Sequence, residues 1–220
     1  DCPRLFPKHH FLADILKPLI GVSLFNANGD LWKSQRSRVD QAFEAARLRQ
    51  VFPSMLLAID DLVLRLMAEI DARKAGASPS GIVDIGEHMG HVTADIIFRT
   101  LFSTAFQPET ARTVYRAFVD YQRCAQRVMG LSALRLPTFW HRYLCRMHGR
   151  SIRHAFAPLV HERFAMRARG DSLPQDMLTA LMLATDPGSG SQFTETEVID
   201  QVGTLFLAGH ETSASTLTWA

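Results

Sequence analysis

The stretch LFLAGHETSASTLTWA (residues 205–220) decides how this chain folds. It is apolar enough to form a buried helix, yet Gly209, His210, Glu211 and Thr212 interrupt it. A glycine inside a helix costs on the order of 1 kcal/mol relative to alanine, which is tolerable where another group must approach the backbone closely. The Thr212 hydroxyl can bond to the Ala208 carbonyl one turn earlier, or replace the helix bond there and open the helix locally. The stretch therefore predicts a polar notch in an apolar helix, with Glu211 as an acid able to deliver protons where water is excluded.

The helix that carries this notch has a strong start signal. Thr194 can accept a bond from the backbone N–H of Glu197, and the Glu197 side chain can reach back to Thr194. A helix over residues 195–220 would be about 39 Å long at 1.5 Å per residue. Because that exceeds the usual helix length, we expect it to thread the whole domain.

Helical periodicity dominates the rest of the chain, without the alternating patterns typical of strands. A turn at residues 26–29 precedes Asp30, which is expected to cap a helix near residues 30–46. Asp84, followed by Glu87 three residues later, predicts the start of another helix. We therefore expect an all-α fold.

Composition excludes several classes of protein. The 220 residues carry 24 Lys and Arg against 22 Asp and Glu, without a dominant basic stripe, which argues against a nucleic-acid partner. The three cysteines form no Cys-x-x-Cys pair and no disulfide framework. No uncharged apolar run reaches the roughly 20 residues of a membrane span, so we expect a cytoplasmic location. The chain starts at Asp1 and ends without helix stop signals, so we interpret it as an internal piece of a longer protein.

Two motifs then point to one family. The stretch AGHETS resembles the oxygen-binding groove in the central helix of the cytochrome P450 monooxygenases, whose pattern is small-Gly-x-acid-Thr-(Thr or Ser). NANGDLWKSQRSRVDQAF resembles the haem-facing helix of that family, in which a Trp-x-x-x-Arg pair meets the haem propionates. Trp32 and Arg36 are four residues apart and so share one helical face. An indole N–H and a guanidinium are suitable donors for carboxylates.

The resemblance covers residues 20–220 and implies a partial cytochrome P450 domain over residues 1–220, all-α as present, with the C-terminal haem-thiolate part missing. Its haem-facing helix would lie near residues 30–46 and its oxygen-groove helix at residues 195–220. The implied cofactor is haem, with O₂ and with electrons from a reductase- or ferredoxin-type partner. The implied reaction inserts one oxygen atom from O₂ into an apolar organic substrate.

The resemblance also implies roles for single residues. Thr212 would hold the oxygen molecule or its water, and Glu211 would feed protons. Ala208 and Gly209 would leave room above the iron, while Trp32 and Arg36 would bind the cofactor from the side. Segments 8–27 and 129–143, both rich in Leu, Ile and Phe, would line the entry of the substrate.

The thiolate loop of this family has the pattern Phe-x-x-Gly-x-x-x-Cys-x-Gly, and the chain lacks it. The residues before Cys124 and Cys145 do not fit, and Cys2 has almost no sequence before it. We therefore assign no iron ligand and no other metal ligand in this chain. We expect the chain by itself not to bind haem tightly and to be inactive as a monooxygenase.

Two alternatives come from other classes of protein. In a non-enzymatic helical interaction module, AGHETS would serve helix packing, and Glu211 and Thr212 would face solvent or a partner. In a helical metalloprotein, Glu87, His88 and His91 would converge on one ion. The basic residues between positions 142 and 169 are interpreted as a solvated face, or alternatively as a contact for an acidic redox partner.

Overall fold

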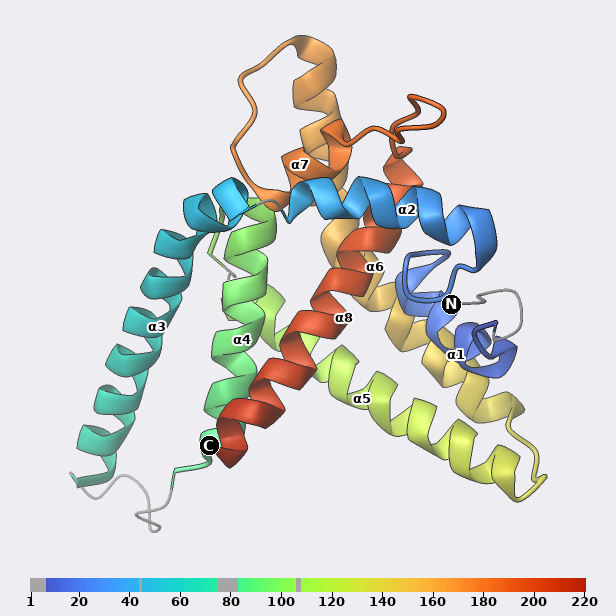
Figure 1. Cartoon of the computed structure of the whole chain (residues 1–220). Helices are drawn as coiled ribbons and strands as arrows, with labels where there is room; N and C mark the ends of the chain where they lie inside the picture. Colours follow the sequence, from blue (N-terminus) through green and yellow to red (C-terminus); the bar gives the residue numbers. More distant parts are fainter. Residues whose placement is uncertain (1–6, 44, 75–82, 106–107) are drawn as a thin grey trace.

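A computed structural model describes residues 7–43, 45–74, 83–105 and 108–220. These residues form eight α-helices and no strand, apart from one isolated bridge between Thr185 and Gln192 (Figure 1). The helices are α1 (His10–Ile20), α2 (Gly29–Ala42), α3 (Ala45–Lys74), α4 (Ile85–Phe102), α5 (Pro108–Ala133), α6 (Phe139–Arg169), α7 (Met177–Leu183) and α8 (Glu195–Trp219). The expectation of an all-α fold is therefore confirmed.

Helix α8 contacts α1, α4, α6 and α7, and Figure 1 shows it crossing the molecule as one straight rod. It begins with the predicted capping box. The Thr194 hydroxyl accepts a bond from the Glu197 N–H at 3.3 Å, and the Glu197 carboxylate accepts one from the Thr194 N–H at 2.8 Å. Because these bonds satisfy donors at the helix end, the start of α8 is fixed by its local sequence.

Helices α4 and α8 run antiparallel along most of their length. Gly86, near the start of α4, lies beside Thr218 near the end of α8, and Gly90 lies beside His210. The predicted cap of α4 is present, because Asp84 Oδ1 accepts a bond from the Gly86 N–H at 2.9 Å. Helix α4 is therefore the support against which the notch region of α8 packs.

The expected cap of α2 is wrong in detail. The helix begins at Gly29, whose φ is +60°, and its N-cap is Asn28, two residues before the expected cap Asp30. Asp30 consequently lies in the first turn, where its carboxylate pairs with Lys33 at 3.1 Å and still complements the helix dipole. The helix also ends at Ala42 rather than near residue 46, and α3 begins at Ala45.

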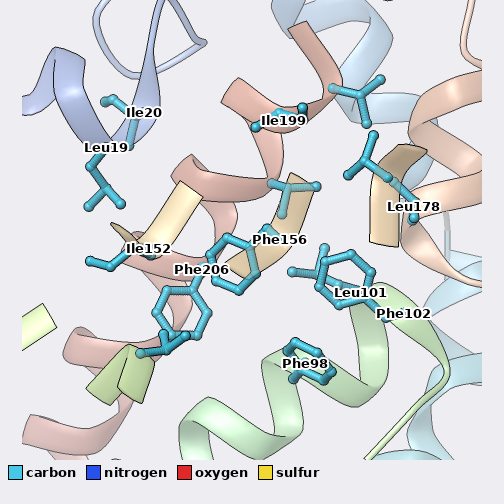
Figure 2. Close-up of a cluster of buried hydrophobic side chains, with 14 of the residues drawn as sticks. Leu19, Ile20, Phe98, Leu101, Phe102, Ile152, Phe156, Leu178, Ile199 and Phe206 are labelled. Carbon is cyan, nitrogen blue, oxygen red and sulfur yellow. The ribbon is translucent and has the colours of Figure 1, made fainter. Parts of the chain in front are cut away.

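The core is built from aromatic rings contributed by several helices (Figure 2). Phe98 and Phe102 of α4 are 4.8 Å apart between ring centroids, Phe156 of α6 lies 6.1 Å from Phe102, and Phe206 of α8 lies 5.0 Å from Phe156. Such ring pairs add about 0.5–1.5 kcal/mol beyond the burial of their area. This cluster holds α8 between α4 and α6 and leaves another face of α8 exposed.

Candidate functional site

The residues of the predicted polar notch lie on the exposed face of α8. The Thr212 hydroxyl donates to the Ala208 carbonyl oxygen at 2.6 Å. Ala208, Glu211 and Thr212 are all exposed. Residues 195–219 stay α-helical throughout, so the local opening considered from the sequence does not occur. The notch therefore presents a carboxylate and a hydroxyl on an intact helix.

Gly209 lies at a close contact between α8 and α4, as the helix-packing alternative for AGHETS predicts. A β-carbon added at this position would stand 2.4 Å from Ile97 Cδ1 and 3.0 Å from Ile97 Cγ1 of α4. The glycine therefore allows α8 to approach α4 closely. Its expected role of leaving room above a cofactor stays a prediction, whereas its contact with α4 is a structural finding.

Two apolar cavities meet at Ala208. The first, here called the α1–α8 cavity, has a volume of about 510 Å³. Its apolar lining includes Leu12, Leu16, Leu24, Phe25, Leu205 and Ala208. The second, the α3–α8 cavity, has a volume of about 290 Å³ and shares Leu205 and Ala208 with the first. Its lining also includes Met55 of α3, Ile97 of α4 and Gly209. The small side chain of Ala208 thus lies where both apolar spaces reach α8.

The α1–α8 cavity is lined mainly by the first of the two segments predicted to line the entry of the substrate. Its lining residues before α8 all fall between Lys8 and Asn26. The second predicted segment, 129–143, does not contribute a described residue to this cavity. Its apolar side chains are instead exposed, with Leu134 at 70% and Phe139 at 77% of their full accessibility.

Sequence reasoning missed the bonds that hold one wall of this cavity. Three polar side chains of α8 bind the loop 21–26 that follows α1. The bonds join the Val22 N–H to Asp200 Oδ2 (2.8 Å), the Leu24 N–H to Gln201 Oε1 (3.3 Å) and the Thr204 hydroxyl to Ser23 Oγ (2.6 Å). Because this loop contributes Leu24 and Phe25 to the cavity, the three α8 residues fix the shape of the apolar space.

The two expected cofactor ligands on α2 differ in their surroundings. Trp32 is half-buried, and Lys8 Nζ lies 5.8 Å from the centroid of its ring. Lys8 also lines the α1–α8 cavity, and its burial lowers the pKa of its ammonium group. Arg36 is exposed and pairs with Asp40 at 2.9 Å. Lys8 thus links Trp32 to the cavity beside Ala208, whereas Arg36 lies on the solvent side of α2.

His210, which occupies the free position of the AGHETS pattern, had no role assigned from the sequence. Its side chain is 5% exposed, and its ring stacks on Phe206 with centroids 5.5 Å apart. Nε2 lies 3.1 Å from the Gly90 carbonyl oxygen, so the neutral ring donates to α4. Burial lowers the pKa of His210 to about 4. A neutral, buried imidazole therefore ties α8 to α4 directly beside Glu211.

The cysteines lie away from the notch. Cys124 of α5 and Cys145 of α6 are buried in the main core. Burial raises the pKa of both thiols, that of Cys145 to about 11. Both are therefore protonated near neutral pH, and Cys2 lies outside the described residues.

The geometry brings together two of the three residues of the metalloprotein alternative and not the third. His91 Nε2 lies 3.7 Å from Glu87 Oε1, and its ring packs on Tyr115 of α5, whereas His88 Nε2 lies 2.9 Å from Glu69 Oε2 of α3. Within the described ranges, no three His, Cys, Asp or Glu side chains converge as metal ligands would. Nor is any helix in those ranges both long and apolar enough to cross a bilayer.

Comparisons with known proteins give the family. The family model for cytochrome P450 matches residues 4–220. The chain is 31% identical to cyclooctat-9-en-7-ol 5-monooxygenase of Streptomyces melanosporofaciens, over 98% of this chain and 44% of that protein. It is also 31% identical to a cytokinin hydroxylase of Arabidopsis thaliana, over 92% of this chain and 39% of that protein. The chain thus spans about two fifths of the length of these curated relatives.

The fold agrees with this match. The crystal structure of the cytochrome P450DA haem domain superposes with a TM-score of 0.70 at 20% sequence identity, covering 92% of this chain and 42% of that one. At this identity the likeness concerns the fold alone, whereas the family match covers nearly every residue, including the notch on α8 and the Trp-x-x-x-Arg pair on α2. The chain belongs to the cytochrome P450 family.

Proposed function

We propose that this chain supplies the oxygen- and substrate-facing half of the active site of a haem monooxygenase. The observation that carries the proposal is the position of the notch. Glu211 and Thr212 are exposed on α8, and Ala208, one turn before Thr212, borders two apolar cavities. A proton-carrying pair beside an apolar space is what oxidation of an apolar molecule requires.

The residues present fit a haem group. Ala208, Thr212 and Ser215 form an exposed stripe of small side chains along α8, against which a flat ring can lie. The Trp32 indole and the Arg36 guanidinium would donate to its propionates. The exposed Arg36–Asp40 pair, an i,i+4 pair on one helix, contributes only about 0.3–0.5 kcal/mol, so Arg36 can exchange Asp40 for another carboxylate. When bound, haem supplies the activation of O₂ and the oxidation itself.

The chain's own part is proton delivery at Thr212. The Thr212 hydroxyl donates to the Ala208 carbonyl, which leaves the lone pairs of Oγ1 available to accept a bond from a water molecule. The exposed Glu211 carboxylate can take a proton from solvent and pass it to that water. Ala208, without a long side chain, leaves room for the reacting molecule beside Oγ1.

The proposed substrate is an apolar organic molecule in the α1–α8 cavity. Leu12, Leu16, Phe25 and Leu205 offer it apolar contacts, and a volume of about 510 Å³ lies in the usual range for small-molecule sites. Electrons would come from a reductase- or ferredoxin-type partner. The iron ligand would be a thiolate other than Cys124 or Cys145, since both are buried away from the notch.

The test compares two threonines of α8 in the haem-loaded enzyme that carries this chain. Thr212 and Thr216 are both exposed and donate to the carbonyl one turn earlier, at 2.6 and 2.8 Å. General acid–base groups contribute about 10²–10⁴-fold to a rate, so Thr212→Ala should lower product formation per O₂ consumed at least about tenfold. Thr216→Ala should leave this ratio unchanged. Equal effects of the two variants would refute the proposed role of Thr212.

The second candidate is the helical interaction module, which also predicts that Glu211 and Thr212 are exposed, as they are. In that case the haem-loaded protein would oxidise no substrate, and Thr212→Ala would weaken the binding of a partner instead. The comparison of the two threonine variants therefore separates the two candidates.

A further inference from the structure

A third cavity, here called the basic cavity, lies on the other side of α1. It has no part in the proposed function. It has a volume of about 610 Å³ and is formed by α1, α6, α8 and the end of α5. Its cationic lining residues are Lys17, Arg142, Arg146, Arg150 and Arg153. Only two carboxylates, those of Asp14 and Asp200, line it with them. Five positive side chains against two negative ones leave the cavity with an excess of three positive charges.

The arrangement of the cations follows from the crossing of α1 and α6. Arg142, Arg146, Arg150 and Arg153 are spaced by four, four and three residues, so they share one face of α6. Gly149 lies on this helix where a β-carbon would stand 2.9 Å from the backbone of Pro18. This close approach brings α1 against α6, with Lys17 facing the arginine row across the cavity.

Part of this charge is compensated within the chain and part is not. Arg153 donates to Asp200, and the Arg142 guanidinium lies 5.6 Å from the centroid of the Phe11 ring. Lys17, Arg146 and Arg150 form no ion pair with an acidic residue in the described part of the chain. Both Arg146 and Arg150 are exposed, so their guanidinium groups can reorient toward a ligand.

We propose that the basic cavity binds the phosphate group of a small molecule, either a phosphate monoester or a diphosphate. Guanidinium groups bind phosphate oxygens in pairs, and Lys17 on the opposite wall can add a third cationic contact. The cations line a concave space rather than a flat surface, which favours a small ligand over the surface of an acidic protein. The free ligand and a lipid headgroup share this chemistry, and the experiment distinguishes them.

The test measures binding of pyrophosphate to the full chain by titration calorimetry at low salt. The site variant Arg146→Ala/Arg150→Ala removes the two exposed arginines of the cavity. The matched control, Arg116→Ala/Arg127→Ala, removes two exposed arginines of α5 that do not line it, with the same loss of charge. Because charge-assisted bonds are strong, the site variant should raise the Kd at least about tenfold, and the control less than about twofold.

A second arm uses vesicles of phosphatidylcholine with and without phosphatidic acid. Binding of pyrophosphate that is lost only in the site variant assigns the cavity to a free phosphate ligand. Binding restricted to phosphatidic acid vesicles, and lost only in the site variant, assigns it to a lipid headgroup. The proposal is overturned if the wild-type chain binds neither probe, or if the site and control variants lose binding equally.

Discussion

Gly209 of α8 faces Ile97 of α4 so closely that a β-carbon at position 209 would stand 2.4 Å from Ile97 Cδ1. The glycine of the AGHETS stretch therefore serves the contact between two helices. The neighbouring His210 donates to the Gly90 carbonyl of α4 at 3.1 Å, so two adjacent residues of this stretch hold α8 against α4.

The first prediction concerns this contact. Gly209→Ala should lower the free energy of unfolding by about 1–2 kcal/mol, because Ile97 must shift toward the α3–α8 cavity to admit the methyl group. Urea titration measures the change. Gly130→Ala on α5 is the control, since a β-carbon there meets nothing within 4 Å. The control should be neutral or stabilising by up to about 1 kcal/mol; destabilisation of both variants to the same extent would contradict the packing role.

The second prediction concerns pH and His210. The ordinary pKa of a histidine is 6.5, and burial lowers the pKa of His210 to about 4 in the folded chain. The unfolded chain therefore binds a proton at this histidine more readily than the folded chain does. The contribution of neutral His210 to the free energy of unfolding is complete above about pH 6.5 and is lost as the pH falls toward 4. Between pH 7 and pH 5 it amounts to about 2 kcal/mol.

His210→Gln tests this pH dependence, because glutamine keeps an N–H donor for the Gly90 carbonyl but does not titrate. The variant should lose about 2 kcal/mol less stability than the wild type between pH 7 and pH 5, as measured by urea titration at each pH. The exposed His154 provides the control, since His154→Gln should follow the wild type. A His210→Gln variant with the wild-type pH dependence would show that the pKa of His210 does not differ between the folded and the unfolded chain.

The third prediction concerns the wall of the α1–α8 cavity. Asp200→Ala removes the acceptor of the Val22 N–H and leaves the partly buried Arg153 without its carboxylate. We expect a loss of about 2–4 kcal/mol of unfolding free energy, since breaking a largely buried pair is costly. Binding of an apolar fluorescent probe to the cavity should weaken as well. Asp60→Ala, an exposed residue of α3, should change neither quantity, and unchanged probe binding in Asp200→Ala would argue against a role in shaping the cavity.

The fourth prediction concerns the cysteines. A thiol must be deprotonated to ligate iron, and burial raises the pKa of Cys145 to about 11 and also raises that of Cys124. With Cys2 replaced by serine, the 220-residue chain mixed with haem should therefore show no thiolate-type absorption band. A band that appears, and then disappears in Cys145→Ser or Cys124→Ser, would contradict this expectation.

Local signals in the sequence predicted local features of the fold. The capping box of Thr194 and Glu197 and the Asp84 cap each depend on atoms within three residues, and both are present. The Thr212 bond to the Ala208 carbonyl, one helical turn away, was predicted for the same reason. Asp30 was assigned the wrong position because the positive φ of a neighbouring glycine, a backbone property, decided where α2 starts.

Contacts between distant parts of the chain were not predictable. His210 pairs with a carbonyl 120 residues earlier, and nothing in its neighbours indicates that partner. The spacing of Trp32 and Arg36 predicted that they share one helix face. It did not predict that the indole is half-buried beside Lys8 or that the guanidinium is exposed and paired with Asp40. Such surroundings depend on how whole helices pack.

The bonds between α8 and the loop 21–26 have a consequence for biosynthesis. Asp200 and Val22 are separated by 178 positions, so the ribosome must add nearly all of this chain before the loop meets its acceptor. At about 5–20 residues per second, roughly 10–40 seconds pass between the synthesis of the loop and that of its partners on α8. During this time the leucine and phenylalanine side chains of the loop are not covered by α8. Chaperones that shield nascent apolar segments would thus meet this chain first at the wall of the α1–α8 cavity.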